Sequence, residues 1–173
     1  MRTNASSGWG AGLLAIALSA LAGCSLQVPF ELTWELPVAG PPGALGVEVS
    51  MDLSQAAELW SRRDEIDDVS VARVRLQVTR LGSRNRAETM SLVVRYRPEG
   101  GTAEGDLELV EVAEFLLTEG ELVEVSPQPG LGAALRDALE GSGRFALVVS
   151  GGADQLVEAS VTLSLAGTAL VAP

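Results

Sequence analysis

The sequence predicts an all-β protein, mainly antiparallel, in which two sheets pack as a β-sandwich with one or two short connecting helices. Apolar and polar residues alternate through most of the chain, and residues typical of turns separate the alternating segments. Alternation with a period of two is typical of strands with one buried and one exposed face. Only two stretches have helical spacing, which favours antiparallel strands over a parallel α/β fold. A closed β-barrel is the alternative architecture.

The first two strands are expected before residue 54. Residues 30–36 alternate apolar with polar side chains, and we expect Pro37 to end this strand. The Gly- and Pro-rich residues 40–43 predict a turn, because both residue types favour the backbone conformations that turns require. Alternation resumes over residues 45–53, so a second strand is predicted there.

Two further strands are predicted in the middle of the chain, over residues 73–79 and 90–97. Residues 81–87 between them suit a hairpin loop. Because consecutive strands joined by a short loop commonly pair, we expect these two strands to lie side by side in one sheet.

The remaining strands follow in the second half of the chain. Residues 107–117 and 121–125 are strand-like, although their alternation is less regular. Clear alternation returns over residues 145–149 and 157–165, and the pair Gly151 and Gly152 predicts the turn between these last two strands.

Two stretches break the alternation and predict helices. Residues 54–66 place apolar side chains at helical spacing, and either Asp52 or Ser54 can cap the first turn. Residues 130–140 have one apolar face and are followed by Gly141, a residue that commonly ends helices. Both helices are short, so we expect them to connect strands.

The beginning of the chain has the features of a secretory signal. Arg2 is the only charged residue before Glu31, and residues 11–23 form an apolar run that ends in small side chains. A membrane-spanning helix needs about 20 apolar residues, so this run is too short to be a transmembrane anchor. We therefore expect it to be removed after export.

The apolar run ends in four residues that together resemble the lipobox of bacterial lipoproteins. These residues are Leu21, Ala22, Gly23 and Cys24. The resemblance implies that the Cys24 thiol receives a diacylglycerol, that cleavage falls between Gly23 and Cys24, and that the new amino terminus is acylated, for example with palmitate. Two or more acyl chains give a stable membrane anchor, whereas one does not. The alternative is an ordinary secretory signal with an unmodified Cys24.

The lipobox resemblance also implies a location and a domain organisation. An Asp after the cysteine commonly retains such proteins in the inner membrane, and Ser25 takes that position here, which favours the outer membrane. The face of that membrane stays open. We expect a signal peptide over residues 1–23, a lipidated anchor with a short tether over residues 24–29, and one β-sandwich domain over residues 30–173.

Composition excludes several kinds of chemistry. The chain has no His and 1 Cys, so it can form neither an imidazole general base, an ordinary zinc site nor an internal disulfide. The net charge of −11 argues against nucleic acid as a partner. We therefore expect no cofactor and no metal.

Arginines gather in the middle of the chain and form a candidate anion-binding patch on the expected hairpin. The patch comprises Arg73, Arg75, Arg84, Arg86, Arg95 and Arg97. Guanidinium groups suit carboxylate and phosphate, so the patch predicts an anionic envelope partner such as a glycolipid, a polymer or an acidic protein surface. The alternative is pairing with acids across the strands, with Glu108, Glu111 and Glu114 as candidates.

Acidic and aromatic residues offer weaker candidates. Asp64, Glu65, Asp67 and Asp68 are rich in oxygen ligands for calcium, yet their spacing does not match an EF-hand loop. A solvated loop explains them more simply, and nothing places two of them across a cleft as glycoside hydrolysis requires. The three aromatics that could line a sugar site lie at inward positions, which favours core packing. They are Trp34, Trp60 and Tyr96.

The sequence thus predicts a non-enzymatic lipoprotein that is held at the membrane through Cys24 and has an interaction or structural role in the cell envelope. An envelope binding module that captures an anionic ligand through its arginine hairpin is the second hypothesis. A carboxylate-dependent hydrolase is the third and is the least supported, because no catalytic residue can be identified.

Overall fold

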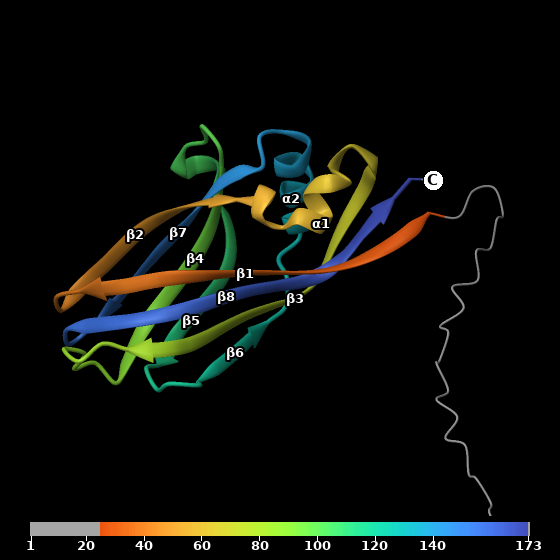
Figure 1. Ribbon diagram of the computed structural model, residues 1–173. Helices are drawn as coiled ribbons and strands as arrows, with labels where there is room; N and C mark the ends of the chain where they lie inside the picture. The colour runs from red at the N-terminus through yellow and green to blue at the C-terminus, as the bar shows by residue number, and fades with distance from the viewer. Residues whose placement is uncertain (1–24, 173) are drawn as a thin grey trace, which may run out of the picture.

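The computed structural model describes residues 25–172 as two four-stranded antiparallel sheets packed face to face (Figure 1). The strand order is β1-β8-β3-β6 in the first sheet and β2-β7-β4-β5 in the second. The strands are β1 Leu26–Gly40, β2 Gly43–Asp52, β3 Ile66–Leu81, β4 Thr89–Pro98, β5 Leu107–Leu116, β6 Leu122–Val125, β7 Arg144–Ala153 and β8 Val157–Val171. This arrangement confirms the predicted β-sandwich, and the sheets do not close into the barrel that was the alternative.

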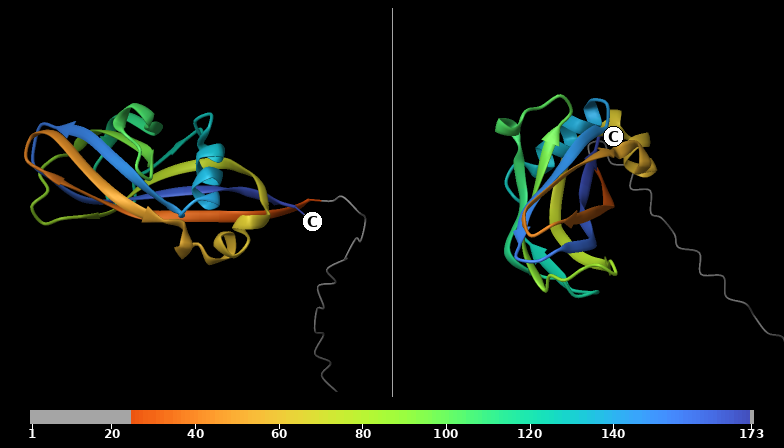
Figure 2. Two further views of the ribbon diagram at one scale, coloured as in Figure 1. Left: turned by 90° about the horizontal axis from the view of Figure 1, so that it is seen from above. Right: turned by 90° about the vertical axis from the view of Figure 1, so that its left-hand side faces the viewer.

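The sandwich is elongated, and its two ends differ (Figure 2). At one end, β1 begins at Leu26 beside the end of β8 at Val171, so we call this the terminal end. The loop between β3 and β4, residues 82–88, lies at the opposite end with the turn that joins β1 to β2. No helix within residues 25–172 is long and apolar enough to cross a membrane.

Strand β1 is longer than the alternating pattern predicted. Residues 26–29, which we expected to belong to a tether, pair with residues 168–171 of β8. The strand also continues through Pro37 to Gly40, although we expected Pro37 to end it. Because β1 is an edge strand, a proline fits wherever its missing N–H would face away from β8.

Strands β3 and β4 do not form the expected hairpin. Strand β3 pairs with β8 and β6, whereas β4 pairs with β7 and β5 in the other sheet. The connecting residues 82–88 therefore cross from one sheet to the other. Both strands point their apolar faces into the space between the sheets, so the same alternation that predicts each strand does not tell which strand it pairs with.

The first predicted helix is broken, and the second is confirmed. The expected helix over residues 54–66 consists of three short helical pieces, and Ala56 interrupts it with non-helical backbone angles. The pieces are η1 Leu53–Gln55, α1 Ala57–Ser61 and η2 Arg63–Glu65, while α2 covers Leu131–Glu140 as predicted. Asp52 caps the first piece, since its side chain accepts a hydrogen bond of 2.8 Å from the Ser54 N–H. One more short piece, η3 Ala103–Gly105, lies between β4 and β5.

Aromatic side chains join the two sheets, as their inward register predicted. Trp34 of β1 packs edge-on against Phe145 of β7, with ring centroids 5.6 Å apart. Tyr96 of β4 is buried and lies 4.9 Å from the same Phe145 ring. Trp60 is half-buried against the core and beneath the guanidinium of Arg63, which lies 4.5 Å from its ring centroid.

Candidate functional site

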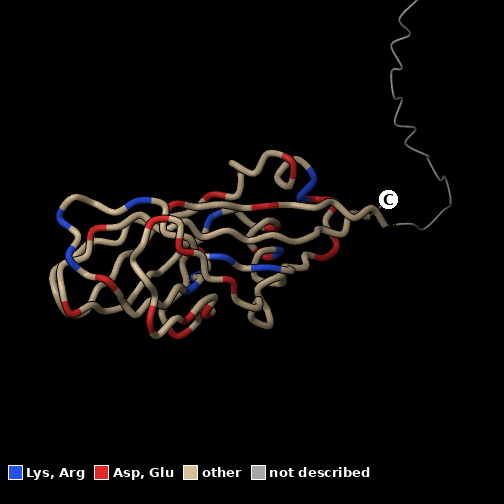
Figure 3. The backbone as a smooth tube through the Cα atoms, turned by 90° about the horizontal axis from the view of Figure 1, so that it is seen from below, with Lys and Arg blue, Asp and Glu red and all other residues tan. Residues whose placement is uncertain are grey.

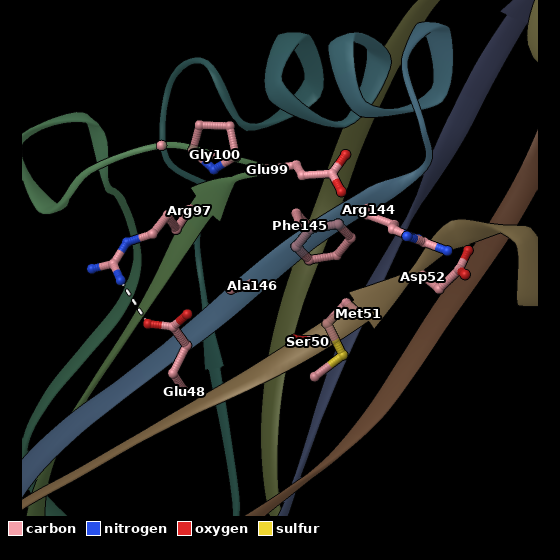
Figure 4. Close-up of a pocket in the computed structure, with 12 residues that line it drawn as sticks. Glu48, Ser50, Met51, Asp52, Arg97, Glu99, Gly100, Arg144, Phe145 and Ala146 are labelled. Atoms are coloured by element: carbon pink, nitrogen blue, oxygen red, sulfur yellow. Dashed lines mark hydrogen bonds and ion pairs between the residues drawn. The ribbon is translucent and has the colours of Figure 1, made fainter.

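A pocket of about 620 Å³ opens at the edge of the second sheet, where β2 and β4 end and β7 begins (Figure 4). Buried Phe145 and Met51 contribute apolar atoms to its wall. Its charged lining consists of Glu48, Asp52, Arg97, Glu99 and Arg144. The volume lies in the usual range of small-ligand sites. What the pocket can bind therefore depends on which of these charged groups already pair with each other.

One side of the pocket is built around Arg97. Its Nε and Nη2 donate to the two carboxylate oxygens of Asp106, both at 2.7 Å, and its Nη1 donates to Glu48 at 2.6 Å. Glu48 belongs to β2, two strands away from β4, and the Arg97 side chain reaches it across the small Ala146 of β7 (Figure 4). The cluster thus joins β2, β4 and the chain before β5.

The electrostatics of this cluster are those of a strong internal ion pair. The hydrogen bonds from Arg97 lower the pKa of Asp106, and the same carboxylate raises the pKa of Arg97. The Asp106 side chain is only 5% exposed, so water screens this pair less than a pair at the surface. Because all three nitrogens of the guanidinium already donate to carboxylates, Arg97 is not available for a bidentate contact with an anionic ligand.

The other side of the pocket carries Arg144. Its backbone N–H donates to the Ser142 hydroxyl at 3.2 Å, and that hydroxyl donates to Glu99. The guanidinium of Arg144 extends toward Asp52 (Figure 4) but forms no ion pair with any carboxylate of residues 25–172. Asp52 itself accepts from Ser54, which lowers its pKa. The pocket therefore presents one unpaired guanidinium among three carboxylates.

The structure does not bring the six predicted arginines together. Arg73 and Arg75 lie on the outer face of the first sheet, and Arg95 and Arg97 lie on the outer face of the second, so the two pairs point in opposite directions. Arg84 and Arg86 lie in the loop between the sheets at the far end. Figure 3 shows the basic residues interspersed with acidic ones along the sandwich. The expected arginine hairpin is therefore wrong, and the six arginines do not form one patch.

Most of these arginines pair with acids, as the alternative predicted. Arg75 pairs with Glu124 at 2.7 Å, and Arg95 pairs with Glu108 at 3.6 Å. The loop residue Arg84 pairs with Glu158 at 3.2 Å, and its N–H groups lower the pKa of that carboxyl. Within residues 25–172, four further candidates take part in no ion pair. They are Arg73, Arg86, Glu111 and Glu114.

The other sequence candidates are placed as follows. Asp64, Glu65, Asp67 and Asp68 are exposed around the start of β3, and Asp64 lies 3.7 Å from Arg63. In the described part of the chain, no group of three or more potential ligands is close enough to hold a metal ion. Gly23 and Cys24 lie outside the described residues.

Sequence reasoning missed the contact of Arg97 with Glu48 and Asp106 as a site. One signal was available, because residues 97 and 106 stand at the two ends of the β4–β5 connection and carry opposite charges. No local signal predicts Glu48, since it lies on a strand that comes close only through the sheet order.

Comparisons with known proteins give distant structural similarity. No family model and no curated protein matches the chain. Among solved structures, the crystal structure of the decameric BFDV capsid protein is 8% identical, covers 87% of this chain and 100% of its own, and has a TM-score of 0.44. A turnip yellow mosaic virus structure is 11% identical, covers 100% of this chain and 91% of its own, and has a TM-score of 0.39. Similarity at this level supports no conclusion about the function of this chain.

Proposed function

We propose that the protein is a lipoprotein of the cell envelope, held at the membrane by an acylated Cys24, and that its sandwich domain has a non-enzymatic interaction or structural role. The lipobox resemblance of residues 21–24 supports the anchor, and the single cysteine of the sequence stands at the position that a lipobox requires. The Ser at position 25 favours the outer membrane.

The observation that carries the proposal is the complete lipobox match at residues 21–24, and the first described strand is compatible with it. Strand β1 starts at Leu26, only two residues after Cys24, and its first residues already pair with β8. A chain that is cut before Cys24 therefore keeps every strand that the structure describes within residues 25–172.

The experiment compares the chain with its Cys24→Ala variant after expression with the native leader in a Gram-negative host. We expect the parent protein to partition with membranes and to have the mass of a chain that begins at Cys24 and carries acyl groups. The variant should be unprocessed or soluble. Ser25→Ala is the matched control, because it changes the adjacent residue and leaves the lipobox intact.

Two results would contradict the membrane anchor. A parent chain that is soluble and has an unmodified Cys24 thiol would contradict the anchor, as would unchanged membrane partitioning and mass in Cys24→Ala. Separation of inner from outer membranes tests the location, since Ser25→Asp should move the acylated protein to the inner membrane.

A further inference from the structure

The outer face of the first sheet carries charges in a pattern that fits its own copy. On this face, Glu31 of β1, Ala166 of β8 and Arg73 of β3 form one row across three adjacent strands. Glu31 and Arg73 are exposed and form no ion pair within residues 25–172. The next rows repeat the order of β1, β8 and β3 with Thr33, Ser164 and Arg75, and then with Glu35, Thr162 and Gln77.

In these rows Glu31 and Glu35 lie on the β1 side of β8, whereas Arg73 and Arg75 lie on the β3 side. Arg75 already pairs with Glu124 of β6, so Arg73 is the arginine of these rows without an ion pair within residues 25–172. The side chains of β8 between them are short, and they leave Glu31, Glu35 and Arg73 free to reach an opposing surface. The β1 and β3 backbones lie about 10 Å apart, which is twice the usual spacing between strands. Along these rows the face thus has a negative margin on β1 and a positive charge at Arg73 on β3, while the exposed acid Asp68 lies nearer the terminal end of β3.

We infer that this face binds a second copy of the chain, in a dimer whose two-fold axis runs along β8. Such a rotation keeps the direction of the strands and exchanges the margins, so β1 of one copy lies over β3 of the other. Glu31 then faces Arg73 of the second copy twice in the dimer. A two-fold interface is self-complementary in this way, because the same surface serves both partners.

The charges also select this arrangement over the other face-to-face dimer. A two-fold axis perpendicular to the strands would place β1 over β1 and β3 over β3. With that axis through Ser164, Glu31 would oppose Glu35 and Arg73 would oppose Gln77 instead of a carboxylate, so like charges would meet and the favourable pair would be lost. The two sheets in the favoured arrangement cross at about 30° because each is twisted, so the rows near the centre, around Ser164, remain opposite each other.

The favoured dimer is compatible with one membrane. Because the axis runs along the strands, both copies have Leu26 at the same end, and both Cys24 residues reach the same surface. This step rests on the proposed function. The perpendicular axis would place the two anchors at opposite ends of a sandwich with strands about 50 Å long, by the usual rise per residue.

The size of the face predicts weak association in solution. Three strands of about 15 residues offer about 700 Å² per copy by strand geometry, which lies at the lower limit of stable interfaces. Confinement to a membrane raises the effective concentration of the partner without any new contact. The dimer should therefore be populated at the membrane and dissociate on dilution of the purified protein.

Cysteine cross-linking tests the geometry in membranes. In the inferred dimer each residue of β8 faces its own counterpart, so Thr162→Cys and Ala166→Cys should each form disulfide-linked dimers with themselves. In the perpendicular arrangement residue 162 would face residue 166, and neither variant alone would cross-link. Val148→Cys, on the outer face of the central strand β7 of the other sheet, is the control and should stay monomeric. Cross-linking at Val148→Cys equal to that at Thr162→Cys would overturn the inference.

Charge reversal tests the recognition. Sedimentation of the purified full-length protein under reducing conditions should show reversible dimerisation that Glu31→Arg or Arg73→Glu weakens about tenfold. The double variant should restore the parent affinity to within about threefold, since it exchanges the two charges of this pair. Glu111→Arg on the other sheet should change nothing. The dimer would be rejected if the losses of affinity in the two single variants simply added in the double variant. It would also be rejected if the protein were monomeric at every concentration and formed no cross-link.

The two proposals fail separately. The mass of the protein reports the modification of Cys24, whereas sedimentation and cross-linking report the sheet face. An unmodified thiol with intact dimerisation would contradict only the anchor. An acylated chain that neither cross-links nor dimerises would contradict only the dimer.

Discussion

At the scale of single residues, the arginines of this protein mainly form ion pairs that stabilise the fold. Arg97 satisfies Asp106 and Glu48 at once, and Arg75 lies directly opposite its partner Glu124 on the neighbouring strand. Exposed pairs of this kind contribute little each, but Asp106 is almost fully buried and would be costly to leave without its partner. The stability of the second sheet should therefore depend on Asp106 more than on any exposed acid.

The first prediction concerns Asp106→Asn. Arg97 lowers the pKa of Asp106 in the folded state, so the folded protein binds this proton more weakly than the unfolded chain does. The resulting stabilisation is fully present above the unfolded pKa of about 4 and is lost as the pH falls through the lowered pKa. We expect the variant to be less stable at pH 7 and to lose less stability between about pH 5 and pH 2 than the parent protein.

Urea unfolding at a series of pH values measures this effect, with the midpoint followed by circular dichroism. Glu111→Gln provides the control, because Glu111 is exposed on the adjacent strand β5 and forms no ion pair in the described part of the chain. Parallel pH profiles for the parent protein and Asp106→Asn would show that the cluster does not stabilise the fold.

At the scale of elements, α2 protects the edge of β3. Strand β6 pairs with β3 only over Val74–Gln77, so the earlier part of β3 lacks a neighbouring strand on that side. Helix α2 packs there, and Gly132 lies so close to β3 that an added Cβ would be 2.0 Å from the Val69 carbonyl oxygen. The Tyr96 hydroxyl donates to the Ala134 carbonyl at 3.0 Å, and burial raises the pKa of Tyr96 to about 12. The helix is thus held between both sheets.

The second prediction is that Gly132→Ala destabilises the protein by about 1–3 kcal/mol, the usual cost of overpacking. The direction of the change in stability separates overpacking from helix propensity, because Ala in place of Gly within a helix normally stabilises by about 0.5–1 kcal/mol. Gly105→Ala is a matched control, since an added Cβ there meets no atom within 4 Å. Chemical denaturation of the three proteins measures the difference, and equal or higher stability of Gly132→Ala would show that α2 does not seal this edge.

The elements also show how far the sequence predicts the fold. Strict alternation located β2 and β4 to within two residues, because each has one buried and one outward face. It found β7 and β8 but ended both too early, since β7 continues through Gly151 and Gly152, where a turn was expected, and β8 continues to Val171. The start of β3 was missed, since register shifts near Asp68 and Arg73 interrupt the period of two. The pairing of β3 and the contact between Arg97 and Glu48 depend on the order of strands in space, which local patterns do not contain.

At the scale of the whole molecule, one core unites the two sheets. Phe145 of the second sheet lies between Trp34 of the first and Tyr96 of its own. Its side chain is 4% exposed, and the surrounding cluster of buried residues draws on both sheets. Because neither sheet can bury its apolar face without the other, the domain should unfold in a single cooperative transition.

The last prediction tests this union with Phe145→Ala. Loss of the ring removes apolar burial and leaves a cavity between the sheets, so we expect a decrease of about 3–5 kcal/mol in the free energy of unfolding. Phe145→Leu, which keeps most of the volume, should cost less than about 1.5 kcal/mol. In a Trp60→Phe background, tryptophan fluorescence of the chain from residue 24 follows the contact between Trp34 and Phe145, whereas far-ultraviolet circular dichroism follows both sheets. The two signals should change together in the parent protein. Separate transitions would mean that the sheets unfold independently and that the aromatic contact does not join them.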